Sequence, residues 1–126
     1  RKYRNGIHKG LDIGMKMDSE NNKTALTKNT SILAIQDGII VRIDKNYLPM
    51  TLGEYNEITE YNQNHPVTFV DRDFGGRQIW IDHKNGVMSS YNHMSSLSPN
   101  LKIGSFVKKG EIIGTVGNSG LKPEAM

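Results

Sequence analysis

Short runs of hydrophobic residues alternate with glycine-containing polar turns along most of the chain. The run Gln78–His83 is the clearest example, because Ile79 and Ile81 fall on every second position, as in a β-strand with one buried face. Nowhere do apolar residues recur at helical spacing over a dozen positions. The pattern therefore predicts a mainly β domain built from antiparallel strands.

The same pattern places the other strands and the turns between them. We expect strands at 11–15, 31–35, 39–43, 78–83, 87–93, 106–107 and 112–117. We expect turns at 18–23 and 84–86, a hairpin joining 106–107 to 112–117, and one helical turn at 94–97. Segments 32–40 and 106–113 resemble each other, since each has a short apolar piece, a glycine turn and a β-branched strand. This similarity is a weak sign of internal duplication.

Residues 45–76 interrupt this rhythm. They are rich in Asn, Glu, Tyr and Gly, and their only strand-like run is Val67–Val70. Structureless connections of this length are uncommon inside a domain and are often functional. We therefore interpret 45–76 as an insertion loop within a single domain that spans 1–126.

Composition excludes several classes of protein. The 126 residues suit one domain, and no apolar run approaches the roughly 20 residues of a membrane-spanning helix. The net charge of +3 is spread over scattered basic residues without interleaved aromatics, which argues against nucleic-acid binding. Cysteine is absent, so a zinc site would need His, Asp or Glu ligands. Because the chain starts at Arg1 without a signal-like segment, we expect a processed product or an excised domain.

The stretch Gly6–Gly14 holds an imidazole, His8, and a carboxylate, Asp12, four positions apart. In a fully extended strand their Cα atoms would lie ~13 Å apart, which is about the limit for two ligands of one metal ion. A bend near Gly10 would bring them closer. An H-x-x-x-D pair alone is more often a turn, so its meaning depends on the rest of the chain.

The other three histidines differ in context. His93 lies at the end of a strand that faces a loop, where site residues tend to collect. We expect His83 to pack beside Tyr91 or to bond a backbone group. We expect His65, which precedes a proline in the insertion, to be a surface residue.

These features belong to a longer ordered set. In chain order the set is Gly6-Ile7-His8-Lys9-Gly10-Leu11-Asp12-Ile13; Ala34, Asp37, Gly38 and Ile40; Ile79, Ile81, His83, Asn85 and Gly86; Tyr91, His93 and Leu97; Gly104, Val107, Gly110, Ile113 and Gly114; and Gly117, Ser119 and Gly120. With these residues the chain resembles the lysostaphin/LytM-type zinc endopeptidases of bacterial cell walls. The resemblance implies an antiparallel β-sandwich of the duplicated hybrid motif, or barrel-sandwich-like, type.

The resemblance also implies a chemistry. His8 and Asp12 would bind Zn²⁺, and His93 would assist at the metal-bound water. The substrate would be a peptide bond in peptidoglycan stems or cross-bridges, and the location would be extracytoplasmic: periplasm, cell envelope or secreted. Other domains or cell-wall regulators are further candidate partners. The insertion would lie near the substrate groove, where it could form a wall or cover.

One part of the family pattern is missing. The third zinc ligand comes from an H-x-H motif, and none follows Gly117–Gly120 in this sequence. We favour a chain that is truncated at its C-terminus just before this motif. The alternative is a catalytically inactive peptidoglycan-binding or hydrolase-activating module of the same fold.

Overall fold

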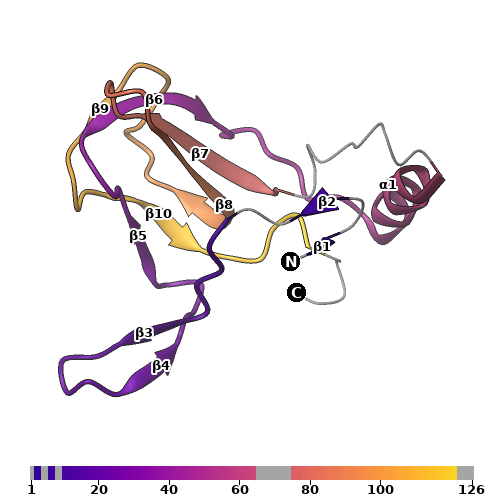
Figure 1. Cartoon of the computed structure of the whole chain (residues 1–126), viewed down its shortest axis with the longest axis horizontal. Helices are drawn as coiled ribbons and strands as arrows, with labels where there is room; N and C mark the ends of the chain where they lie inside the picture. Colours follow the sequence, from indigo (N-terminus) through magenta and orange to yellow (C-terminus); the bar gives the residue numbers. More distant parts are fainter. Residues whose placement is uncertain (1, 4–5, 8–9, 65–74, 122–126) are drawn as a thin grey trace.

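The computed structural model describes residues 2–3, 6–7, 10–64 and 75–121 (Figure 1). Its elements are β1 (Lys2–Tyr3), β2 (Gly6–Ile7), β3 (Met15–Met17), β4 (Lys23–Ala25), β5 (Ser31–Leu33), β6 (Gly38–Ile43), α1 (Leu52–Asn64), β7 (Arg77–Asp82), β8 (Met88–Leu97), β9 (Phe106–Val107) and β10 (Ile112–Val116). The fold is mainly β and antiparallel with one short helix, as the sequence predicts. No helix in the described part of the chain is both long and apolar enough to cross a membrane.

A curled sheet of six strands forms the body, in the order β5-β10-β8-β7-β6-β9. Its centre is the β7–β8 hairpin, whose turn at Lys84–Gly86 is confirmed. Lys84 and Gly86 have positive φ, and the His83 amide donates to the Val87 carbonyl at 3.0 Å. The helical turn expected at 94–97 is wrong, because these residues continue β8 and pair with β10.

The core lies on one face of this sheet. Ile79 and Ile81 are fully buried, as their alternation predicts, and they pack with Ile40 of β6, Met94 of β8 and Ile113 of β10. Burying one such side chain contributes roughly 1.5–3 kcal/mol, so this cluster holds the central strands together.

The strands that flank the two glycine turns do not pair with each other across the turn. Each pairs with a strand from the other segment. The hairpin expected between 106–107 and 112–117 is wrong: β9 pairs with β6, and β10 pairs with β5. Backbone bonds continue both pairings, from the Ala34 amide to the Glu111 carbonyl and from the Ile40 amide to the Ser105 carbonyl, each 2.9 Å. Segments 32–40 and 106–113 therefore pair with each other reciprocally, which agrees with an internal duplication.

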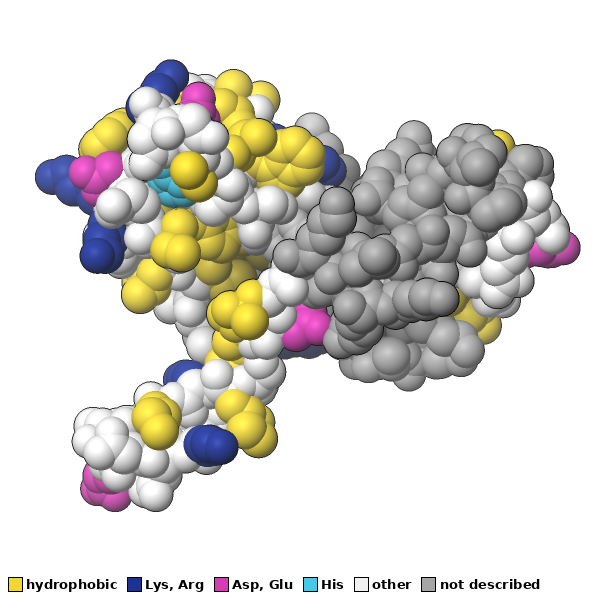
Figure 2. Space-filling view, in the orientation of Figure 1, with side chains coloured by type: hydrophobic (Ala, Val, Ile, Leu, Met, Phe, Trp, Pro, Cys, Tyr) yellow, Lys and Arg dark blue, Asp and Glu magenta, His cyan; other side chains and the backbone are white. Residues whose placement is uncertain are grey.

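A two-stranded ribbon, β3–β4, projects from the body (Figures 1 and 2). The turn expected at 18–23 is confirmed, since the Asp18 carboxylate accepts the amides of Glu20 and Asn22 at 2.9 Å. The strand expected at 11–15 is wrong, because regular pairing begins only at Met15. Met15 and Met17 on the ribbon are 59% and 63% exposed.

The expected insertion contains a helix that the hydrophobic pattern does not predict. Helix α1 has 13 residues and little amphipathic character, so its sequence shows no apolar stripe at helical spacing. Its start is a capping box: the Glu54 amide donates to Thr51 Oγ1 at 3.1 Å, and the Thr51 amide donates to the Glu54 carboxylate at 3.2 Å. The Thr-x-x-Glu spacing is the signal that could have identified it. His65 and the strand-like run 67–70 lie outside the described residues.

Candidate active site around His93

The structure describes two of the three residues that the resemblance singles out. His93 is half-buried inside β8, four residues before the strand ends, so the expectation that it lies at the end of a strand is wrong. Asp12 is an exposed carboxylate on the irregular segment before β3. His8 lies outside the described residues. Among the residues that the structure does describe, no three His, Asp or Glu side chains gather as a metal site.

A β-bulge sets the direction of the His93 side chain. Arg77 pairs with Met94 and Ile79 with Tyr91, so one residue of β7 opposes two residues of β8, one of which is His93. His93 has φ of 59°, in the left-handed region that non-glycine residues rarely adopt. Its amide donates to the Gly75 carbonyl at 2.9 Å, which ties the bulge to the chain entering β7.

The imidazole of His93 is fixed by one of its two nitrogens. Nδ1 lies 2.6 Å from the Ser119 carbonyl oxygen. A carbonyl oxygen only accepts hydrogen bonds, so Nδ1 carries the proton and donates it. In the neutral ring Nε2 is then the nitrogen with a lone pair, and it can accept a proton or bind a metal ion.

Ser119 connects His93 to the sheet. It is buried, and its Oγ accepts the Arg77 amide at 2.9 Å and donates to the Met94 carbonyl at 2.7 Å. Gly76, with φ of 66°, lies so close that an added Cβ would collide with the Ser119 carbonyl. The sequence marks Ser119 only as part of a glycine-serine turn and gives no sign that its carbonyl holds His93.

His83 has a structural environment at the opposite end of β7. Its Nδ1 lies 2.8 Å from the Asp37 carbonyl oxygen, and its Nε2 lies 2.8 Å from Ser89 Oγ. Ser89 Oγ is also 2.8 Å from the Tyr91 hydroxyl, which accepts the Ile35 amide at 3.0 Å. The prediction that His83 bonds a backbone group is confirmed, and both of its nitrogens are used by the fold.

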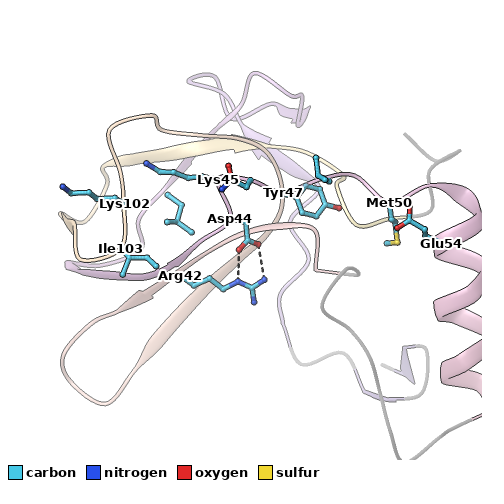
Figure 3. A pocket seen from close by; sticks show the side chains of 11 residues that line it. Arg42, Asp44, Lys45, Tyr47, Met50, Glu54, Lys102 and Ile103 are labelled. Carbon is cyan, nitrogen blue, oxygen red and sulfur yellow. Dashed lines mark hydrogen bonds and ion pairs between the residues drawn. The ribbon is translucent and has the colours of Figure 1, made fainter.

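An open groove adjoins the end of β6 (Figure 3). It has a volume of about 880 Å³, and its lining includes Tyr47, Met50 and Glu54 from the first part of the expected insertion. Within its lining, Arg42 donates to both carboxylate oxygens of Asp44, at 3.0 and 3.1 Å. The first part of the expected insertion therefore forms a wall of a groove.

Comparison with protein families gives a match to the model described as Peptidase family M23, over residues 6–125. Searches among curated proteins and among solved structures found no match. The family match covers the segment with His8 and Asp12, the bulge at His93 and the turn at Ser119.

Proposed function

The chain belongs to peptidase family M23, and on that premise we propose that it is a zinc-dependent endopeptidase of peptidoglycan peptides. Peptidases of this family use zinc and act on the cell wall, generally outside the cytoplasm. The proposed site consists of His8 and Asp12 as metal ligands and His93 as the catalytic histidine. Because the family generally acts outside the cytoplasm, we also propose an extracytoplasmic location for this chain.

The observation that carries the proposal is the bonding of the His93 ring. Its Nδ1 is held by the Ser119 carbonyl, and among the described residues Nε2 has no hydrogen-bond partner. An imidazole with one nitrogen fixed and the other available is suited to general acid–base chemistry. The positive φ at His93 supports the same reading, because strained residues persist mainly where function requires them.

The donor chemistry fits zinc. Imidazole and carboxylate are both zinc ligands, and the absence of cysteine leaves His, Asp and Glu as the available donors. When bound, zinc would lower the pKa of water and polarise the scissile carbonyl. Neutral His93 would take the proton from the attacking water through Nε2. Once protonated, the ring would donate from Nε2 to the oxyanion or to the leaving amine.

The test uses the protein as the cell produces it, with purified peptidoglycan peptides as substrate. Removing a positioned acid–base group should lower kcat by roughly 10²–10⁴-fold in His93→Ala, with bound zinc nearly unchanged by elemental analysis. Asp12→Ala should lower zinc content as well as cleavage. His83→Ala removes the same ring from the far end of β7; it should lower stability, because both nitrogens bond the fold, but the folded protein should retain cleavage.

The outcomes separate the alternatives. Loss of zinc in His93→Ala would make His93 a ligand instead of the acid–base group. A protein that binds muropeptides without zinc or cleavage would support the alternative, a binding or hydrolase-activating module.

A further inference from the structure

Two adjoining hollows form what we call the basic groove, lined by residues 42–48, 95–99 and 102–103 together with Met50, Glu54 and Arg77. The larger hollow has a volume of about 880 Å³ and the smaller about 340 Å³, and Lys45 lines both. Figure 3 shows side chains that line the larger one, with Arg42 and Asp44 joined by hydrogen bonds among them. Four cations line the groove against two carboxylates, Asp44 and Glu54.

Both carboxylates are already engaged by the fold. Asp44 receives both bonds from Arg42, and it also accepts the Gln78 amide at 3.1 Å. Glu54 accepts the Thr51 amide in the capping box of α1. Asp44 is therefore paired with Arg42, and Glu54 is held at the start of α1, where no ion pair to a cation of the groove is found among the described residues.

Three cations remain: Lys45, Lys102 and Arg77. Among the described residues no carboxylate lies within ion-pair distance of any of them. Arg77 is half-buried, and its Nη1 donates to the carbonyls of Met94 and Ser95 at 3.1 and 2.6 Å. A guanidinium has five N–H donors, so Nε and Nη2 keep three without an acceptor among the described residues.

The guanidinium of Arg77 is held in one orientation. The two carbonyls fix one end, and the plane lies over the Tyr47 ring at 5.2 Å from its centroid. Its remaining edge, Nε with Nη2, has the fork geometry that matches the two oxygens of a carboxylate. The smaller hollow is lined by this guanidinium, Lys45 and three serines, with no acidic residue among its lining.

The smaller hollow lies along β8 beyond His93. Arg77 donates to the carbonyls of the two residues that follow His93 on β8, and Ser95 itself lines the smaller hollow. At ~3.3 Å per residue, Ser95 lies about 7 Å along the strand from His93. A peptide bound with its scissile bond at His93 would thus reach the hollow within two or three residues.

We propose that the basic groove binds a free carboxylate of the peptide substrate, with Arg77 as the bidentate partner and Lys45 as the second cation. This specificity rests on the proposed peptidase function. The size of the smaller hollow suits one side chain or chain end, which favours a peptide carboxylate over a charged polymer running along the surface.

The experiment measures binding separately from cleavage. A His93→Ala protein, which leaves the substrate intact, is titrated with a peptidoglycan stem peptide that has either free or amidated carboxyl groups. We expect the free-carboxylate peptide to bind roughly tenfold more tightly. Adding Lys45→Met should reduce this preference to less than about threefold. Adding Lys84→Met, a lysine in the distant β7–β8 turn, should leave it unchanged.

Each result has a distinct meaning. Equal Kd values for the two peptides would overturn the carboxylate site, even if the unsubstituted protein cleaves both. A clear preference without cleavage by the unsubstituted protein would support the site and refute the peptidase. Tighter binding of a glycerol-phosphate polymer than of the free-carboxylate peptide, lost in Lys45→Met, would overturn the assignment to a peptide. Arg77→Lys, which keeps the charge and loses the fork, should weaken binding of the free-carboxylate peptide alone.

Discussion

The hydroxyl of Ser119 offers a sharp test of how the fold holds His93. Ser119→Ala removes an oxygen that accepts the Arg77 amide at 2.9 Å and donates to the Met94 carbonyl at 2.7 Å. The Met94 carbonyl keeps a second donor, the Arg77 guanidinium at 3.1 Å, so its loss is small. The Arg77 amide has no such substitute in the described structure. Leaving a buried donor unsatisfied costs about 1–3 kcal/mol, and the other lost bond about 0.5–1.5 kcal/mol.

We therefore expect Ser119→Ala to lower the free energy of unfolding by about 2–3 kcal/mol, measured by denaturant titration. Ser98→Ala is a matched control, because its hydroxyl makes a single bond, to the Ile112 carbonyl at 2.9 Å, near solvent. It should cost about 1 kcal/mol or less. If the two variants unfold at the same denaturant concentration with equal slopes, Ser119 is not the connection that we describe.

Loss of the Ser119 hydroxyl should also slow the proposed cleavage reaction. Without its hydroxyl anchor, the Ser119 carbonyl no longer has a fixed position for the His93 Nδ1 proton. Cleavage by Ser119→Ala should fall in kcat because the His93 tautomer is no longer fixed, and KM should rise by a smaller factor because Ser119 Oγ also bonds the Arg77 amide. A rise in KM alone would contradict this link.

Two further predictions compare matched positions. Gly76 and Gly86 both have positive φ, so alanine should cost about 1–2 kcal/mol at either, but only at Gly76 would the new Cβ also meet the Ser119 carbonyl. Thermal unfolding should show Gly76→Ala as clearly the less stable, and equal melting temperatures would contradict the close approach. Asp44→Asn should lose about 1–2 kcal/mol, since Asp44 accepts a bidentate guanidinium and a backbone amide. Asp82→Asn keeps an oxygen for the Lys84 amide, which donates to Asp82 Oδ1 at 2.9 Å, and loses only the ion pair with Lys84 Nζ at 3.8 Å near solvent. It should stay within about 0.5 kcal/mol, and similar losses in both would show that the bonds to Asp44 contribute little.

Local signals in the sequence were enough to predict the centre of the sheet. The alternation at Ile79 and Ile81 identifies β7, and Asn85-Gly86 identifies the turn into β8, because both depend on residues that are close in the chain. The pairing of β9 with β6 and of β10 with β5 depends on residues that are far apart in the chain. A glycine turn between two short strands usually makes a hairpin, and only packing against β5 and β6 decides otherwise.

The site shows the same limit. The order of motifs in the sequence reflects the family, and from it we predict His8, Asp12 and His93 as site residues. The bulge, the positive φ and the bond from Nδ1 to Ser119, 26 residues along the chain, arise only when β7, β8 and the glycine-serine turn pack together. Helix α1 was missed for a different reason, because its start is encoded by Thr51 and Glu54 and not by an apolar stripe.

The two histidines of the β7–β8 hairpin differ in how many of their ring nitrogens the fold uses. In each, Nδ1 donates to a backbone carbonyl, of Asp37 for His83 and of Ser119 for His93. His83 also uses Nε2, on Ser89 Oγ, so protonation chemistry there would disturb the hairpin. His93 has no such second bond among the described residues, so the fold holds the ring and leaves Nε2 for the proton of the attacking water in the proposed mechanism. The use of the second nitrogen, more than the presence of a histidine, therefore supports His93 as the proposed catalytic residue.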